Sequence, residues 1–156
     1  MPGLVNETRA LTRATVYGVL VLALCLGSCG SGGTPVITGE VTAVQKMPFH
    51  GPGGPGTEPV SITFMWTVVV KATGASDCVV EAIRTDIREP QSGEAVEADA
   101  TPSRVLPDGE PVELPQEQGG LFHSTLYSRP WSGQSQVTVG CAGGEHQEIG
   151  IAFTVP

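Results

Sequence analysis

Three histidines, His50, His123 and His146, are the residues best suited to bind a metal or to act as general bases. A zinc site needs several ligands that converge in space, and none of the three has a second His or Cys at zinc-ligand spacing. Glu145 and Glu148 flank His146, but side chains at a hairpin tip diverge and stay hydrated. We therefore expect no metal site and no cofactor.

The chain also lacks the usual signatures of a catalytic nucleophile. It contains no G-x-S-x-G motif, and its carboxylates between Glu94 and Glu117 lack the regular spacing of a calcium loop. The glycine-proline segment 51–56 carries no lysine and is a poor phosphate cradle. We expect no catalytic residues and interpret the chain as a non-enzyme. The alternative is a small metal-dependent or hydrolytic enzyme that uses His123 or His146.

One cluster of residues is typical of binding surfaces. Tyr127, Arg129 and Trp131 lie close together, and these residue types are enriched at interaction hot spots. We treat the three as a candidate binding surface in a loop at one end of the fold. The alternative is that Trp131 covers one end of the core, with Arg129 stacked on it.

The N-terminal segment has the pattern of an export signal. Arg9 and Arg13 precede an apolar run from Val16 to Leu26. As a helix this run would rise only ~16 Å, about half of a hydrocarbon core of roughly 30 Å. That length suits a secretory signal peptide better than a membrane-spanning helix.

The residues that follow this run, Leu26-Gly27-Ser28-Cys29, resemble the lipobox of bacterial lipoproteins. The resemblance implies cleavage before Cys29 and attachment of a diacylglyceryl group to its sulfur. It divides the chain into a signal peptide (1–28), a flexible tether (29–33) and one folded domain (34–156), anchored by lipid at the extracytoplasmic face of the cell membrane. The alternative is an ordinary signal peptide that leaves Cys29 as a free thiol.

With Cys25 removed in the signal and Cys29 carrying lipid, two of the four cysteines remain, Cys78 and Cys141. In an oxidising compartment two such cysteines pair by default, so we expect a disulfide between them. Cys141 shares strand parity with Val137 and Val139, which predicts a sulfur that points into the core and a bridge between two sheets. The alternative is two separate buried thiols.

The charge balance excludes one class of partner. The chain has 8 Lys and Arg against 16 Asp and Glu, a formal net charge of −8, and it has no basic stripe. Binding to nucleic acid requires clustered cations, so no nucleic-acid partner is expected. The 21 Gly and 13 Pro in 156 residues are typical of a turn-rich chain and not of a helical bundle.

Period-two alternation predicts strands in several places. In the segment 60–71 every even position is apolar, which is typical of a half-buried strand. A second strand is expected over 34–44, interrupted at Gly39. Segments 137–141 and 149–155 predict a hairpin, with Gly143 and Gly144 in its turn.

The remaining segments are less regular. Segment 78–88 fits either a strand or a helix, and the short spacing between turn signals favours a strand. Segment 99–118 is acidic and contains four prolines, so we expect short edge strands or loop there, with a turn at Pro107-Asp108-Gly109. Another strand is expected over 121–127.

About seven strands separated by turns indicate an all-β, antiparallel β-sandwich, immunoglobulin-like in architecture. The sequence thus predicts a lipid-anchored, non-enzymatic domain that binds a protein or a component of the cell envelope. A further alternative is a structural protein of the envelope without a defined ligand.

Overall fold

The computed structural model describes residues 34–49, 59–74, 77–144 and 146–156, which are almost entirely antiparallel strands. The expected signal peptide (1–28), the expected tether (29–33) and His50 lie outside these ranges. The strands are β1 (Val36–Phe49), β2 (Val60–Thr73), β3 (Cys78–Arg88), β4 (Ala95–Ala100), β5 (Arg104–Leu106), β6 (Pro111–Phe122), β7 (Trp131–Gly140) and β8 (His146–Val155). A single turn of 3-10 helix, η1 (Ser124–Leu126), precedes β7.

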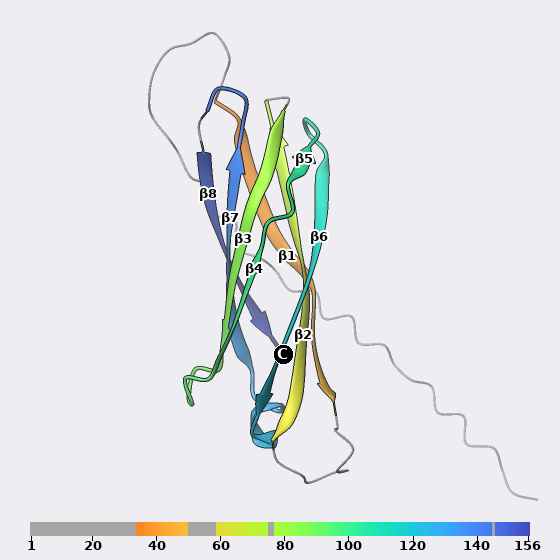
Figure 1. Ribbon diagram of the computed structural model, residues 1–156, viewed down its shortest axis with the longest axis vertical. Coiled ribbons are helices and arrows are strands. Elements are labelled where there is room, and N and C mark those ends of the chain that lie inside the picture. Colours follow the sequence, from red (N-terminus) through yellow and green to blue (C-terminus); the bar gives the residue numbers. More distant parts are fainter. Residues whose placement is uncertain (1–33, 50–58, 75–76, 145) are drawn as a thin grey trace, which may run out of the picture.

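The strands form two sheets that face each other (Figure 1). Sheet A has the order β1-β2-β6, and sheet B has the order β4-β3-β7-β8, with β5 continuing the β4 edge alongside β3. The all-β, antiparallel, two-sheet prediction is confirmed. The sheets remain open at their edges and do not close into a barrel.

The core lies between the sheets and comes from the alternation seen in the sequence. On β2 the side chains of Ile62, Phe64, Trp66, Val68 and Val70 are all buried. Sheet B contributes buried aliphatic and aromatic residues from the facing side, which are Val80, Ile83, Ile87, Val137, Val139, Ile151, Phe153 and Val155. Alternation with period two is what a strand with one buried face requires, so the prediction for 60–71 is confirmed.

The irregularity of β1 is not where the sequence placed it. The strand runs through Gly39 without a break, and its register with β2 shifts between Thr42 and Gln45 instead. Ala43 and Val44 together face the single residue Trp66, and Ala43 has a φ of 51°. This is a β-bulge, which adds one residue to one strand of a pair.

Gly39 has a packing role instead of a strand-breaking one. A Cβ at this position would lie 2.6 Å from the Cδ1 of Ile151 on β8. The missing side chain therefore lets β1 of sheet A come close to β8 of sheet B.

The segment 78–88 is a strand, as the turn spacing favoured. Its alternation continues through Cys78, Val80, Ile83, Thr85 and Ile87, all buried, with a register shift against β7 between Val80 and Ala82. The irregularity at Glu81 changes the buried parity from even positions before it to odd positions after it. The central position of β3 in sheet B supplies the partners that a strand needs.

Two expectations for the region after β4 need correction. Segment 99–118 was expected to form short edge strands or loop, which the three-residue edge strand β5 confirms in part, but most of its second half belongs to the 12-residue edge strand β6. The expected strand over 121–127 ends at Phe122, because His123 caps η1. The turn at Pro107-Asp108-Gly109 is confirmed, with Gly109 at a φ of 75°.

Prolines are tolerated in β6 because it is an edge strand of sheet A. Pro111 and Pro115 pair with Lys71 and Thr67 and share one parity along the strand. Proline has no backbone N–H, so in an edge strand it fits at positions where the N–H of another residue would point away from the neighbouring strand. Both prolines therefore remove hydrogen-bond donors from the open edge.

The predicted hairpin at the C-terminal side is confirmed. β7 and β8 pair from Trp131 with Val155 to Gly140 with His146, and Gly143 and Gly144 in the turn both have positive φ. In the part of the chain that the structure describes, no helix has the length and apolar character needed to cross a membrane.

Candidate functional site

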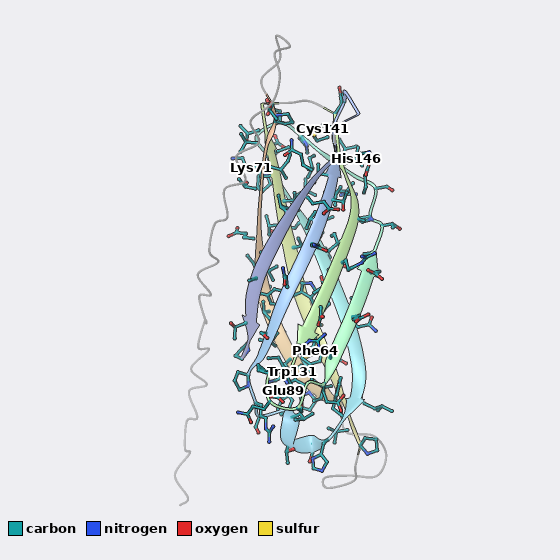
Figure 2. The ribbon with its side chains drawn as sticks, turned by 90° about the vertical axis from the view of Figure 1, so that its left-hand side faces the viewer. Phe64, Lys71, Glu89, Trp131, Cys141 and His146 are labelled. Carbon is teal, nitrogen blue, oxygen red and sulfur yellow. A yellow bond between two sulfur atoms is a disulfide. The ribbon has the colours of Figure 1, made fainter. Side chains whose placement is uncertain are left out.

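The two ends of the molecule differ in what holds them together (Figure 2). Cys141 and His146 lie at one end, and Phe64, Glu89 and Trp131 lie at the other. We refer to them as the disulfide end and the aromatic end.

Cys78 and Cys141 are joined by a disulfide, as predicted, with their Cα atoms 4.0 Å apart. The expectation that this bond would bridge the two sheets was wrong. Cys78 begins β3 and Cys141 follows β7, and these are neighbouring strands of sheet B. The disulfide therefore links β3 and β7 covalently at the end of their hydrogen-bonded pairing.

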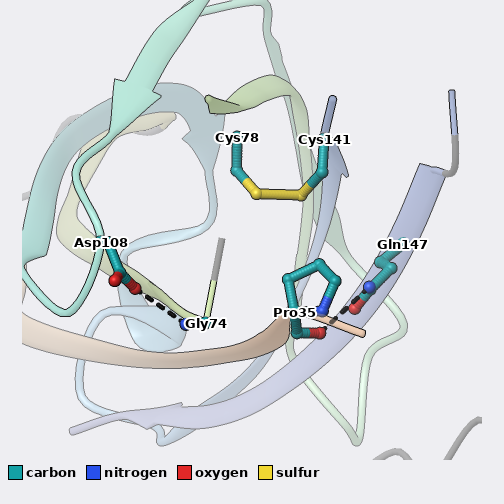
Figure 3. The surroundings of a disulfide bond; sticks show 6 residues. All are labelled: Pro35, Gly74, Cys78, Asp108, Cys141 and Gln147. Atoms are coloured by element: carbon teal, nitrogen blue, oxygen red, sulfur yellow. Dashed lines mark hydrogen bonds between the residues drawn. A yellow bond between two sulfur atoms is a disulfide. The ribbon is translucent and has the colours of Figure 1, made fainter. Parts of the chain in front are cut away.

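Two hydrogen bonds join other strands at the same end (Figure 3). The Gln147 side chain on β8 donates to the carbonyl of Pro35 just before β1, at 3.2 Å. The Gly74 N–H after β2 donates to the Asp108 carboxylate at 2.8 Å. At the disulfide end, hydrogen bonds therefore connect β8 to the residue before β1, and the end of β2 to the turn after β5, in addition to the disulfide within sheet B.

The two histidines in the described ranges, His123 and His146, lie apart from each other at opposite ends of the molecule (Figure 2). Nδ1 of His146 lies 2.9 Å from Oε2 of Glu81, and both side chains are largely exposed. His123 instead caps η1 at the other end, where its Nδ1 accepts from the N–H of Thr125. Within the described ranges, no three His, Cys, Asp or Glu side chains gather closely enough to hold a metal ion.

The candidate surface of Tyr127, Arg129 and Trp131 is brought together, but Trp131 faces inward. Its side chain is 1% exposed and its Nε1 donates to the Leu126 carbonyl at 3.0 Å. Its ring packs edge-on against Phe64 and Phe122, with centroids 4.9 and 5.2 Å away. Trp131 thus covers one end of the core, and any contact surface here would consist of its partly exposed neighbours.

Tyr127 and Arg129 lie beside the end of β1. Because of the β1 bulge, Lys46 falls on the inward-facing side of its strand, and its Nζ donates to the Arg129 carbonyl at 2.7 Å. The same amine lies 5.4 Å from the centre of the Tyr127 ring. Burial lowers the pKa of Lys46 from its ordinary value.

Arg129 also pairs with a buried carboxylate. Its Nη1 lies 3.6 Å from Oε2 of Glu89, whose side chain is 2% exposed. Glu89 accepts hydrogen bonds from the N–H groups of Gln91 and Ser92 at 3.2 and 2.6 Å. Hydrogen bonding from Ser92, together with the smaller effects of Gln91 and the Arg129 charge, holds the pKa of Glu89 below its ordinary value.

A polar trough crosses the outer face of sheet B, and the sequence reasoning did not find it. It has a volume of about 320 Å³ and receives side chains from all four main strands of the sheet. They include Ala82, Arg84, Asp99, Gln136, Thr138 and Glu148. No local pattern in the sequence marks these residues, because only strand pairing brings positions from 82 to 148 together.

Comparison with known proteins places the fold but not the family. The Northeast Structural Genomics Consortium target SoR45 is similar with a TM-score of 0.57 at 15% sequence identity, over 76% of this chain and 85% of that chain. The putative ApaA protein from Bordetella pertussis is similar with a TM-score of 0.53 at 16% identity, over 78% and 93%. At such identities the similarity concerns the fold alone. Models of protein families and curated proteins give no match.

Proposed function

We propose that this chain is a lipid-anchored β-sandwich of the extracytoplasmic face of a bacterial cell membrane, and that it binds a protein or an envelope component without catalysing a reaction. The observation that carries the proposal is the disulfide between Cys78 and Cys141. Disulfides persist in oxidising compartments and are rare in the cytosol. This agrees with the export signal and with the lipobox-like residues Leu26–Cys29.

The proposed architecture is immunoglobulin-like. The first, second and sixth strands form one sheet, while the third, fourth, seventh and eighth form the other. This arrangement supports a sandwich in which the chain crosses between sheets, as immunoglobulin-like domains do. The disulfide within sheet B distinguishes it from antibody domains, whose bridge joins the two sheets.

Intact mass tests the anchor and the compartment together. We expect chain extracted from membranes to lack residues 1–28, to carry added acyl mass, and to be alkylated at two thiols only after reduction. A Cys29→Ser variant serves as the control and should lose the acyl mass while keeping the disulfide. Unlipidated chain with free thiols at Cys78 and Cys141 would contradict the proposal.

Photo-crosslinking in cells tests the binding role. A photoreactive residue at exposed Ser128, beside Tyr127 and Arg129, should capture one reproducible partner. A photoreactive residue at exposed Ala142, at the disulfide end, is the matched control. Position 128 is preferable to a Trp131→Ala variant, because removing that buried ring would disturb the core. If neither position captures a partner protein and no envelope glycan binds, the binding proposal fails.

A further inference from the structure

The trough on sheet B arises from an interruption in the edge of that sheet. Pairing of β4 with β3 begins at Ile83, and pairing of β5 with β3 stops at Val80. Glu81 and Ala82 therefore have no register partner in either edge strand. The chain between the two edge strands, 101–103, includes Ser103 at a φ of 46°, which turns it away from a continuous ladder. The trough therefore follows from the gap between β4 and β5 along β3.

The trough continues across the sheet on side chains from rigid strands. Arg84 pairs in register with Asp99 on β4 and with Gln136 on β7. One row further, Thr138 of β7 lies opposite Ala82 and Glu148. Side chains held on strands keep their relative positions better than side chains on loops.

The chemistry of the lining selects a class of ligand. The lining combines one guanidinium, two carboxylates, an amide and hydroxyl groups, so it can both donate and accept hydrogen bonds. Its single cation, Arg84, is already paired with Asp99 at 3.1 Å, which disfavours phosphate. The apolar part of the lining comes from Ala82, Ala100 and the buried Ile83, so no large apolar side chain projects into the trough, which disfavours a hydrophobic ligand.

A peptide is also a poor fit for this position. Peptides that bind β-proteins commonly add a strand to a free edge, where backbone groups are available. Only Glu81 and Ala82 lack an edge-strand partner here, which is too short a stretch for strand addition, and the rest of the trough presents side chains. A ligand with many hydroxyl groups, each of which donates and accepts, matches the face better.

From these observations we infer that the trough binds a short segment of a neutral glycan. This rests on the proposed function and specifies its envelope component as a carbohydrate. Gln136, Thr138 and Glu148 bond to sugar hydroxyls. The Arg84–Asp99 pair, with side chains 76% and 74% exposed, opens at little cost to contact the same ligand.

Calorimetric titration of the full chain in detergent with cellotriose, maltotriose and triacetylchitotriose tests the inference. We expect saturable binding of at least one trisaccharide. Gln136→Ala and Glu148→Gln should each weaken it by about fivefold to tenfold, the effect of losing one or two hydrogen bonds. Gln134→Ala is the matched control, because Gln134 lies on the same strand and face but outside the trough, and it should bind within about twofold of the unchanged chain.

A bulky residue at Gly150 gives a second test that removes no polar group. Gly150 pairs with Gln136, and the atom nearest to a Cβ there is Nε2 of Gln134 at 3.8 Å. Gly150→Leu should fold normally and weaken trisaccharide binding by about tenfold by covering the trough. The inference is overturned if no trisaccharide binds, or if the trough variants bind as tightly as Gln134→Ala. If no trisaccharide binds but photo-crosslinking at Ser128 captures a partner protein, the proposed binding function is supported and only the glycan inference fails.

Discussion

Glu89 is the buried charge around which the aromatic end is organised. It closes the turn between β3 and β4 through the N–H groups of Gln91 and Ser92, and it pairs with Arg129 before β7. One carboxylate thus connects two segments far apart in the sequence. A buried carboxylate keeps its charge only where hydrogen bonds and an opposite charge compensate for lost hydration.

Replacing this carboxylate by an amide should make stability less dependent on pH. The pKa of Glu89 in the folded chain lies below its ordinary value of 4.5, so its contribution is complete above that pH and is lost as the pH falls through the folded pKa. We expect Glu89→Gln to lower Tm by several degrees at pH 7. The Tm difference from the unchanged chain should shrink towards pH 3, as scanning calorimetry would show. A difference that is constant with pH would contradict this account.

Gly133 makes room for an aromatic ring. A Cβ at this position would lie 2.2 Å from Cζ of Phe153, the residue opposite it on β8. Gly133→Ala must displace that ring, and overpacking of this kind costs about 1–3 kcal/mol. Urea unfolding measures the loss, with Gly150→Ala on the outer face of β8 as the control. Equal stability of the two variants would show that the ring moves freely.

At the level of elements, the disulfide stabilises the β3–β7 pair at one end. The cysteines are 63 residues apart, and a bridge that closes a loop of this length contributes roughly 4 kcal/mol in the chain-entropy model. The double variant Cys78→Ala, Cys141→Ala should lose about that much in urea unfolding. The unchanged chain measured in reductant provides the matched comparison. If the free energy of unfolding falls by less than about 1 kcal/mol in both the double variant and the reduced chain, strand pairing alone stabilises this end.

The bulge in β1 sets which side chains of its second half face the core. It leaves Val44 packed against the core and places Lys46 level with Phe64. Deletion of Ala43 should remove the extra residue and leave Val44 opposite Trp66, so the following residues keep their register and faces. We expect this deletion, and Ala43→Gly, which relieves a φ of 51°, to change Tm little. Deletion of both Ala43 and Val44 should instead move every following residue to the opposite face and lower Tm strongly. Thermal unfolding followed by circular dichroism distinguishes these variants, and a double deletion that leaves Tm unchanged would refute the register argument.

The elements that the sequence predicted best are those whose pattern is local. The alternation on β2 was sufficient to predict that strand, and the glycines between β7 and β8 were sufficient to predict their turn. Both features depend only on residues that are close in the sequence. The bulge at Ala43 left no signal, since alanine rarely adopts positive φ and nothing in its neighbours required it. Gly39 was misread because glycine marks a break and a close approach of backbones alike.

The candidate site shows the same limit at the scale of the whole molecule. Cys78 and Cys141 could be paired by elimination, but their place in one sheet depended on strand order. Trp131 and Arg129 could be grouped because they are neighbours in the sequence, whereas the partner of Arg129, Glu89, could not be found that way. The trough was invisible for the same reason, because strand pairing assembles it from four strands.

Stability should also be distributed unevenly across the molecule. β2, β3 and β7 have a neighbour on both sides, while β1, β6 and β8 are edge strands. We expect amide hydrogen exchange to be slowest on the central strands. Reduction of the disulfide should accelerate exchange at 78–80 and 139–141 but not at 131–133. Uniform acceleration would indicate that the sandwich opens as one unit.

The hydrogen bond from Gln147 to Pro35 has a consequence for how an anchored molecule would stand. It places the start of β1 at the disulfide end (Figure 3). Only five residues, 29–33, precede Thr34 after the proposed cleavage, and fully extended they reach at most about 18 Å. With a lipid at Cys29, the disulfide end would be held close to the bilayer and the strands would point the aromatic end outward. The molecule would then present Tyr127 and Arg129 at its distal tip and the sheet B trough on its flank.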